Sequence, residues 1–344
     1  MSLSYFILSG EHPSLPFSEL KSVCGLYGVN IDWILIDGRI AVGYSPKAVH
    51  HEVCMRAAYV KEAGLAFSIE ALQPGRAPKI GIQEDLLQVV GDKTASFKTE
   101  AIKLGGAKAN RVELEKAFSD QVLCSLKNLK ISLEKPDIVF TCIVTPSTLV
   151  TGLRLAQKPI HYFTGRRAGM RPFKIPSALQ PKLARCMVNM AVKTLQDTVL
   201  DPFAGSGSIP LEAVLMNHPA VGMELKTWIT NGMLANIRHY DGGWEMVVQG
   251  DARHPPFREG FDAIVTDPPY GRSSTIPGKS LSRLLEDFLN TSLQLLRRGG
   301  KICITLPSEP EDLIDLEGLG LKILEKHTVY IHKNLTRFLV VMSR

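Results

Sequence analysis

The stretch that decides the fold reads FDAIVTDPPYG and runs from residue 261 to residue 271. Its first six residues form a mostly apolar run, typical of a strand buried in a parallel sheet. The run ends in an acid, two prolines and an aromatic ring, which are Asp267, Pro268, Pro269 and Tyr270. Asp267 and the carbonyl flanking Pro268, whose direction the proline ring sets, can each accept one N–H bond of an amino group, and Tyr270 can stack on a planar base. The stretch therefore favours methylation of an exocyclic amino group, although such a tetrapeptide in isolation is more often a simple turn.

A second segment predicts a ligand-binding turn. Residues 199–215 read as strand, Gly-rich turn and helix, the topology of a Rossmann-like nucleotide site. The turn lacks the full dinucleotide fingerprint, and it opens with Asp201, which would repel a pyrophosphate. An acid at this position suits a cationic, amine-bearing ligand such as S-adenosylmethionine.

Two more acids fall at the ends of expected strands. Residues 220–224 read as the second strand, which ends in Glu224, and residues 244–251 read as the third, which ends in Asp251. Glu224 can accept both hydroxyls of a ribose, and Asp251 is positioned for an adenine amino group. Each acid alone is more often a solvated strand end. Four strand-end acids in order along one α/β pattern predict a single ligand site at the carboxyl edge of the sheet.

With these motifs, the region from about Arg171 to Arg344 resembles class I S-adenosylmethionine-dependent methyltransferases of the amino-methylating type. The resemblance implies that residues 201–207 bind the methionine part of the cofactor and that residues 267–270 are catalytic. The cofactor-binding residues that it implies are Asp201, Phe203, Ala204, Gly205, Ser206, Gly207, Glu224, Asp251, Ala252 and Asp267.

The rest of this region fits the same fold. We expect a helix over residues 281–296, a turn at Gly299-Gly300 and a strand over residues 301–306. Residues 321–331 and 335–342 read as two closing strands, and their connection is too short for a parallel crossover, so they should pair antiparallel. The predicted fold class is α/β, with a Rossmann-like seven-stranded methyltransferase domain over residues 176–344.

The first part of the chain predicts a smaller α+β domain. We expect a strand at residues 5–8, a helix at 16–26, a strand hairpin over 33–44 and a helix from about 46 to 63. This order resembles a small ferredoxin-like unit over residues 1–65.

Residues 66–157 predict a second module. We expect a strand at residues 94–100, a turn at Gly105-Gly106, a helix at 112–126 and a strand-turn-strand over 129–144. The last string resembles the THUMP domain, an RNA-binding module of tRNA-modifying enzymes, although few basic residues lie in its strands.

An acid-free stretch follows. Between Ile138 and Gln196 there is no Asp or Glu, whereas nine Lys and Arg residues lie there. Such a distribution is typical of a surface that binds phosphates, whereas an ordinary linker, the alternative, usually carries both signs of charge. We expect a basic linker at residues 158–175 and RNA contacts from Arg154, Lys158, Arg166, Arg167, Arg171 and Lys174.

Composition narrows the class of protein further. The 344 residues suggest two or three domains, and 45% hydrophobic with 22% charged residues is typical of a globular protein. The six cysteines and nine histidines show no metal-ligand spacing, so we expect no metal and reduced, buried cysteines. No membrane span or signal peptide is apparent, and we expect a cytoplasmic monomer or small homo-oligomer.

Taken together, the chain resembles archaeal THUMP-domain tRNA guanine 2-amino methyltransferases of the position-ten family. The resemblance implies an enzyme that uses S-adenosylmethionine to add one or two methyl groups to guanosine in tRNA. The alternatives are a sister enzyme for position six, a DNA amino-methyltransferase, and a catalytically inactive RNA-binding protein. An inactive fold should have lost strand-end acids or glycines, and all are present.

Overall fold

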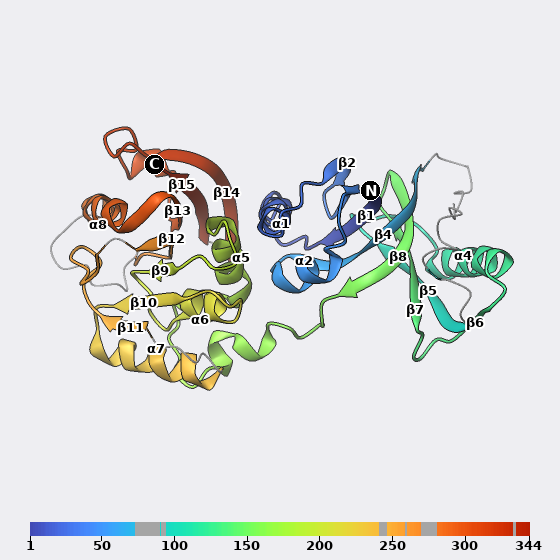
Figure 1. Ribbon diagram of the computed structural model, residues 1–344, viewed down its shortest axis with the longest axis horizontal. Coiled ribbons are helices and arrows are strands. Elements are labelled where there is room, and N and C mark those ends of the chain that lie inside the picture. The colour runs from blue at the N-terminus through green and yellow to red at the C-terminus, as the bar shows by residue number, and fades with distance from the viewer. Residues whose placement is uncertain (73–89, 91–93, 241–245, 259, 270–280, 333–334) are drawn as a thin grey trace. The chain divides into compact units, whose positions relative to one another are not determined.

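The protein is described by a computed structural model, which covers residues 1–72, 90, 94–240, 246–258, 260–269, 281–332 and 335–344. The chain divides into two compact units (Figure 1). The N-terminal unit comprises residues 1–11, 27–55 and 60–158, and the C-terminal unit comprises residues 12–26, 56–59 and 159–344. The helix predicted at residues 16–26 is therefore part of the C-terminal unit.

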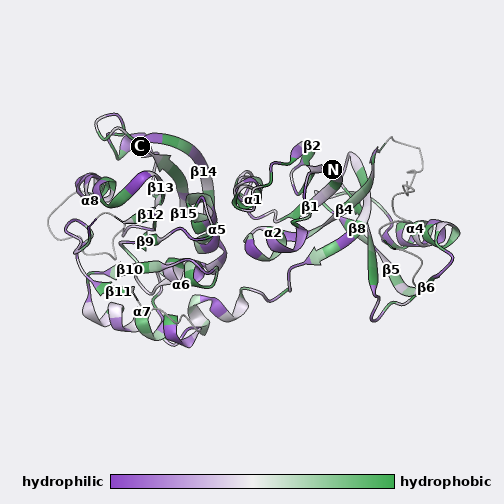
Figure 2. Cartoon of the chain, in the orientation of Figure 1, coloured by the Kyte–Doolittle hydropathy of each residue, from purple (hydrophilic) through white to green (hydrophobic). Residues whose placement is uncertain are grey.

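The described part of the N-terminal unit contains a sheet of eight strands in the order β2-β3-β1-β4-β8-β7-β5-β6. The strands are β1 (Ser2–Leu8), β2 (Asp32–Asp37), β3 (Ile40–Ser45), β4 (Val60–Ala71), β5 (Ala95–Lys103), β6 (Leu129–Ile131), β7 (Ile138–Val144) and β8 (Thr148–Gln157), and the helices of this region are α2 (His50–Arg56) and α4 (Arg111–Ser125). Phe140 of β7 lies in the core, where the rings of Phe97 and Phe118 meet it edge-on at centroid distances of 5.7 and 6.0 Å. Hydrophobic residues concentrate along these strands (Figure 2).

The boundary predicted between residues 65 and 66 falls inside β4. This strand pairs with β1 on one side and with β8 on the other. One continuous sheet therefore joins the segments that the sequence suggested as separate ferredoxin-like and THUMP domains.

The helix predicted from about residue 46 to residue 63 is wrong in its second half, because α2 ends at Arg56 and β4 begins at Val60. Residues 57–63 contain good helix formers, but sheet pairing overrides this local preference. Gly64 shows how closely β4 packs against its neighbours in the sheet, because a Cβ there would overlap the backbone of Leu153 and the ring of Tyr5. The other predicted elements of this unit are present, with ends that differ by a few residues.

The C-terminal unit contains a seven-stranded sheet in the order β11-β10-β9-β12-β13-β15-β14. Its strands are β9 (Val199–Asp201), β10 (Ala220–Glu224), β11 (Met246–Gln249), β12 (Phe261–Thr266), β13 (Leu296–Leu306), β14 (Lys322–His332) and β15 (Leu335–Ser343). Its helices are α1 (Leu15–Leu26), α5 (Pro181–Ala191), α6 (Ser208–Val214), α7 (Thr227–His239) and α8 (Leu281–Leu295), with short 3₁₀ turns at η1 (Thr164–Arg166), η2 (Ala168–Met170) and η3 (Pro310–Asp312).

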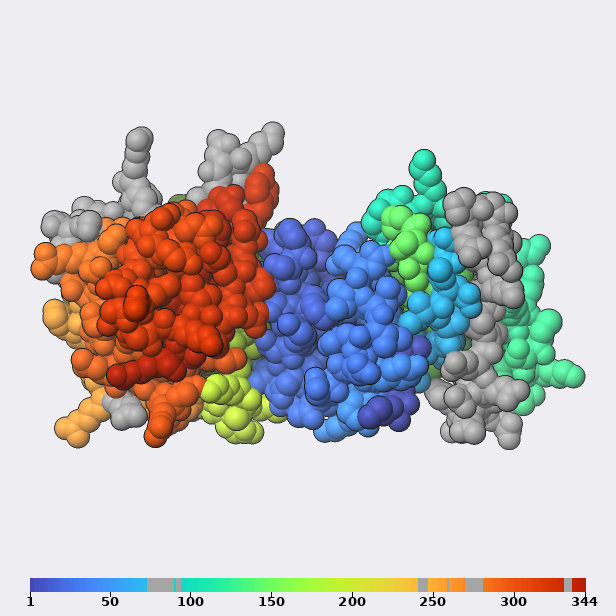
Figure 3. All heavy atoms as spheres, turned by 90° about the horizontal axis from the view of Figure 1, so that it is seen from above, coloured from blue at the N-terminus to red at the C-terminus, as the bar shows by residue number. Residues whose placement is uncertain are grey.

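The strand directions confirm the predicted fold class. The strands from β11 to β13 run parallel, and β15 pairs antiparallel with both β13 and β14. This reversed strand is the one that the short connection near residue 333 predicted, and residues 333–334 themselves lie outside the described residues. In the space-filling view of Figure 3, the last part of the chain, in red, lies at the surface of this unit.

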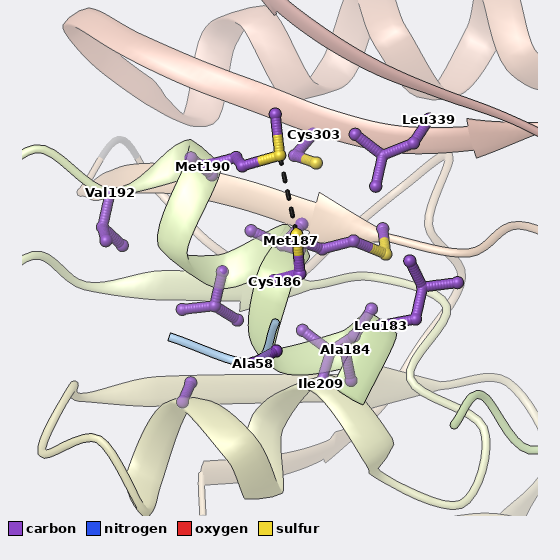
Figure 4. Packing of buried hydrophobic residues seen from close by; sticks show 14 of the residues in the cluster. Ala58, Leu183, Ala184, Cys186, Met187, Met190, Val192, Ile209, Cys303 and Leu339 are labelled. Atoms are coloured by element: carbon purple, nitrogen blue, oxygen red, sulfur yellow. Dashed lines mark hydrogen bonds between the residues drawn. The ribbon is translucent and has the colours of Figure 1, made fainter. Parts of the chain in front are cut away.

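Helix α5 fills the core on one face of the sheet. Met187 and Met190 of α5 lie with Cys303 of β13, Leu339 of β15 and Ile209 of α6 (Figure 4). The expectation of buried, reduced cysteines holds for Cys303 and four others and is wrong for Cys124, which is exposed on α4.

Candidate active site

The four predicted strand-end acids line one pocket of the C-terminal unit, with a volume of about 320 Å³. Asp201 ends β9 and Glu224 ends β10, whereas Asp251 and Asp267 follow β11 and β12. The parallel order of these strands brings the carboxylates to the same edge of the sheet. Four side chains spread over 67 positions of the sequence thus face one cavity.

The Gly-rich turn forms the floor of this pocket. Gly205 and Gly207 have φ angles of 51° and 85°, which L side chains rarely adopt. A Cβ at Gly207 would also lie 2.8 Å from the side chain of Met233. The predicted residues that line the pocket here are Phe203, Ala204, Gly205 and Ser206. Gly207 contributes the turn that starts α6 and does not line the pocket.

Asp201 is buried at the end of β9. Its carboxylate accepts hydrogen bonds from the backbone N–H of Phe203 at 3.1 Å and from the hydroxyl of Thr266 at 2.7 Å. Burial raises the pKa of Asp201 to about 8, and the charges of Asp267 and Glu224 act in the same direction. A cationic ligand group beside this carboxylate would favour its ionised form.

The acids at the ends of β10 and β11 have different neighbours. Glu224 is half-buried, and one carboxylate oxygen accepts the N–H of Lys226 at 3.1 Å. Asp251 pairs with the guanidinium of Arg253 at 2.6 Å and accepts its backbone N–H at 2.9 Å. These bonds hold the pKa of the Asp251 carboxyl below its ordinary value. A contact between Asp251 and an adenine would therefore share the carboxylate with Arg253, a residue that the sequence did not single out.

Asp267 is held by two side chains, one from β13 and one from β15. The Nη1 of Arg337, on β15, donates to both carboxylate oxygens at 2.9 and 2.7 Å. The hydroxyl of Thr305, on β13, also donates to Asp267. Pro268, Pro269 and Arg337 line the pocket beside it, whereas Tyr270 lies outside the described residues. Arg337 was missed, although a charged residue within the apolar run 335–342 was an available signal.

A segment that starts at the end of the expected basic linker forms a wall of the same pocket. It is lined by Ile175, the last residue of that linker, and by Ser177, Ala178 and Leu179, which belong to the expected methyltransferase domain. The hydroxyl of Ser208 donates to the carbonyl of Leu179 at 2.9 Å, which fastens this wall to α6. The segment is thus a built part of the site.

The predicted RNA-binding residues separate into two groups. Arg154 pairs with Glu62 at 2.7 Å within the N-terminal unit, and Arg166 pairs with the buried Glu212 at 2.7 Å. Arg171 is 1% exposed and donates to Ser208 at 2.7 Å. The structure places these three guanidinium groups in internal contacts, and their role as phosphate ligands stays a prediction.

The second group remains accessible. Arg167 and Lys174 are exposed, and Lys158 is half-buried. Cations at the surface can reach phosphates, so these three stay candidates for RNA contacts.

Metal and membrane features can be assessed for the described residues alone. Among them, no three His, Cys, Asp or Glu side chains lie close enough together to hold a metal ion. None of the described helices has the length and apolar character needed to cross a membrane.

A parallel sheet with one reversed strand, a Gly-rich turn and acids at four strand ends define a class I methyltransferase fold. Residues 168–336 match the family model described as the RMKL-like methyltransferase domain. The chain is 32% identical over 341 residues, 98% of each chain, to the tRNA (guanine(10)-N2)-dimethyltransferase of Methanothermobacter thermautotrophicus. The chain therefore belongs to the position-ten family of tRNA guanine N2-methyltransferases.

Two further comparisons concern a relative named for another tRNA position and a solved structure. The tRNA (guanine(6)-N2)-methyltransferase of Thermus thermophilus is 26% identical over 223 residues, which cover 61% of each chain. The crystal structure of TrmN from Thermus thermophilus superimposes with a TM-score of 0.55 at 20% identity and covers 99% of each chain, a likeness of fold.

Proposed function

We propose that this protein transfers methyl groups from S-adenosylmethionine to the 2-amino group of guanosine at position ten of tRNA. The observation that carries the proposal is the placement of Asp267, whose carboxylate is oriented by Arg337 and Thr305 beside Pro268 at the pocket. A relative named for position ten is 32% identical over 98% of the chain, whereas relatives named for position six are 23–26% identical over 61–73% of it, which favours position ten. Because the first relative is named a dimethyltransferase, we propose that two methyl groups can be added.

The pocket residues fit S-adenosylmethionine. Asp201, the acid whose ionised form a cation would stabilise, is suited to the amino group of the methionine part. Glu224 would accept the ribose hydroxyls, and Asp251 with Ala252 would lie beside the adenine. When bound, the cofactor supplies a methyl group on a positively charged sulfur.

The protein's own contribution is positioning and electrostatics. The lone pair of the guanine 2-amino group is delocalised into the ring, so the nitrogen is a poor nucleophile. A hydrogen bond from this amino group to Asp267, and a second to the carbonyl flanking Pro268, would draw the nitrogen toward tetrahedral geometry. Arg337 and Thr305 would keep the Asp267 carboxylate in one orientation during this step. As the acceptor of the hydrogen bond from the amino group, Asp267 would also receive the proton that the nitrogen releases as the C–N bond forms.

The RNA-docking part of the proposal rests on the remaining cations and on the THUMP resemblance of residues 129–144. We propose that Lys158, Arg167 and Lys174 contact phosphates and that the N-terminal unit docks the tRNA. The enzyme would then act in the cytoplasm, as a monomer or small homo-oligomer.

One experiment separates position ten from its alternatives. The purified full-length protein is incubated with S-adenosylmethionine and an in vitro transcribed tRNA that carries guanosine at positions six and ten, and its nucleosides are analysed by mass spectrometry. We expect N2-methylated guanosine with the parent tRNA and with a variant changed at position six, and none with a variant changed at position ten. Methylation that disappears only in the position-six variant would identify the sister activity. Duplex DNA that is methylated as efficiently as tRNA would identify a DNA enzyme, and absence of cofactor binding would identify an inactive fold.

A further inference from the structure

Residues 165–173, which precede α5, pack along helix α7 and form one surface with it. Gly165 accepts a hydrogen bond from the Tyr240 hydroxyl, and the Asn236 side chain accepts the N–H of Phe173 at 2.9 Å and donates to its carbonyl at 3.0 Å. A Cβ at Gly232 would overlap the ring of Phe173. The segment therefore lies along the row of α7 that contains residues 232, 236 and 240, and Figure 1 shows it in green beside the end of α7.

At the pocket end of this row of α7, Trp228 and Phe173 form an aromatic pair. The ring of Trp228, near the start of α7, meets the ring of Phe173 edge-on at a centroid distance of 5.8 Å. Trp228 is nevertheless 60% exposed. Its neighbours Leu225, Lys226 and Ile229 line the cofactor pocket, so the exposed indole lies close to the pocket rim. A large aromatic ring that the fold leaves open to solvent in this way is typical of an interaction site.

The charge of residues 159–240, the range that contains the indole, favours one kind of partner. From residue 159 to residue 240 the acids are Asp197, Asp201, Glu212 and Glu224, of which the first three are buried and the last is half-buried. Exposed cations from the same range are Arg167, Lys174, Lys193, Lys226 and Arg238. A surface with exposed positive charges, no exposed carboxylate between residues 159 and 240, and one open aromatic ring complements single-stranded nucleic acid.

We propose that Trp228 stacks on an unpaired base of the tRNA while Lys174, Lys226 and Arg238 bind phosphates around it. This inference rests on the proposed function, and it adds a docking surface on the methyltransferase unit itself. The position of Trp228 beside the pocket would let the same contact guide a neighbouring nucleotide toward Asp267. Asn236 has a supporting role, because it holds Phe173 against α7 and also donates to the carbonyl of Ser206 in the Gly-rich turn at 3.0 Å.

The test compares full-length Trp228→Ala with Trp228→Phe. Filter binding measures the tRNA dissociation constant at several salt concentrations, and calorimetry measures the cofactor affinity. Because stacking on an aromatic side chain contributes about 1–3 kcal/mol per base, Trp228→Ala should bind tRNA about 5-fold to 100-fold more weakly. Trp228→Phe should recover most of the affinity, and both variants should bind S-adenosylmethionine as the wild type does.

Arg238→Glu tests the charge, with Lys322→Glu as its control. Lys322 is an exposed cation on β14, at the opposite edge of the sheet from β11. Arg238→Glu should weaken tRNA binding and make its salt dependence shallower, and Lys322→Glu should leave both close to wild type.

Two results would contradict the proposed docking surface and leave the proposed function unaffected. One is a wild-type enzyme that methylates tRNA while Trp228→Ala binds tRNA within twofold of wild type. The other is a loss of cofactor affinity in Trp228→Ala with unchanged tRNA affinity. A wild-type protein that neither binds nor methylates tRNA would instead contradict the proposed function.

Discussion

Asp201 and Asp267 follow neighbouring strands of one sheet, yet the protein surrounds their carboxylates differently. Asp201 is buried and accepts hydrogen bonds from two neutral donors, Phe203 and Thr266. Asp267 accepts hydrogen bonds from a guanidinium, that of Arg337. At equivalent strand ends, burial thus raises the pKa of the Asp201 carboxyl to about 8, whereas Arg337 balances the charge of Asp267.

This difference predicts different roles for the two acids, with Asp201 acting in cofactor binding and Asp267 in methyl transfer. Asp201 lacks a cation among its hydrogen-bond donors in the described structure, so a cationic ligand would stabilise its ionised form. Asp267 has its cation already and is therefore set in place before a substrate arrives. The comparison predicts that changes at Asp267 act on turnover and that changes at Asp201 act on cofactor binding.

The largest expected effect is that of Asp267→Ala. The amino group interacts with Asp267 most strongly during transfer, so turnover should fall about 30-fold to 1,000-fold, as for the loss of one preorganised charged hydrogen bond worth roughly 2–4 kcal/mol. Cofactor affinity, measured by calorimetry, should change little. Turnover above about a tenth of the wild-type value would remove Asp267 from catalysis.

Arg337→Ala should have the next largest effect. Without the guanidinium the Asp267 carboxylate loses its orientation, and hydrogen bonds to charged groups contribute about 1.5–3 kcal/mol, so turnover should fall about 10-fold to 100-fold. Arg337→Lys should recover part of this loss.

A double variant distinguishes positioning from a general structural role. If Arg337 acts through Asp267, adding Arg337→Ala to Asp267→Ala should reduce turnover no further. An additive loss in the double variant, together with a lowered melting temperature, would show that Arg337 supports the fold and not the carboxylate.

The two acids also show what a sequence can and cannot predict. Asp201 and Asp267 were both predictable, because each ends a local apolar run and parallel strands bring such ends together. For Arg337 only the charge within an apolar run was a local signal. Its contact with Asp267 was not predictable, because it lies 70 positions later and meets Asp267 only through the antiparallel insertion of β15 beside β13. Contacts that depend on strand order are not written in any local pattern.

Charge counting shows a similar limit. The acid-free stretch between residues 138 and 196 was read as one phosphate-binding surface. Arg166 and Arg185 in fact converge on the buried Glu212, which lies outside that stretch at the centre of α6. Net charge along the chain shows where cations are, and tertiary pairing decides which of them remain available. The role of Tyr270 stays a prediction, since it lies outside the described residues.

Glu224→Ala extends the comparison to a third strand end. Glu224 is half-buried and its carboxylate accepts the N–H of Lys226, so it differs from both acids above. Loss of its bonds to the ribose should weaken cofactor binding by about 1–2 kcal/mol, or about 5-fold to 30-fold, in a calorimetric titration. Turnover at saturating cofactor should stay near wild type. Unchanged affinity would identify Glu224 as a surface acid without a ligand.

The last prediction concerns the pH dependence of cofactor binding. Because burial raises the pKa of Asp201 to about 8, this carboxyl is mostly protonated at neutral pH in the protein alone. A cationic ligand group binds the ionised form better, so cofactor affinity should rise as the pH increases from 6 to 8, by at most about tenfold per pH unit. Calorimetry in buffers of different ionisation enthalpy should also detect the proton that Asp201 releases on binding.

Asp201→Asn is the matched control, since it keeps the shape and removes the titration. Its cofactor affinity should be lower at pH 8 and independent of pH between 6 and 8. The stability of the folded protein should change with pH in the opposite direction to the cofactor affinity. A carboxyl titrates near pH 4 in the unfolded chain and, for Asp201, near pH 8 in the folded one, so the folded wild type holds one more proton between these values and loses stability as the pH rises. The asparagine variant should therefore melt at a higher temperature than the wild type at pH 8, by a margin that shrinks toward pH 5. A wild-type affinity that stays flat from pH 6 to 8, with an asparagine variant that binds equally well, would show that no cationic group of the ligand meets Asp201.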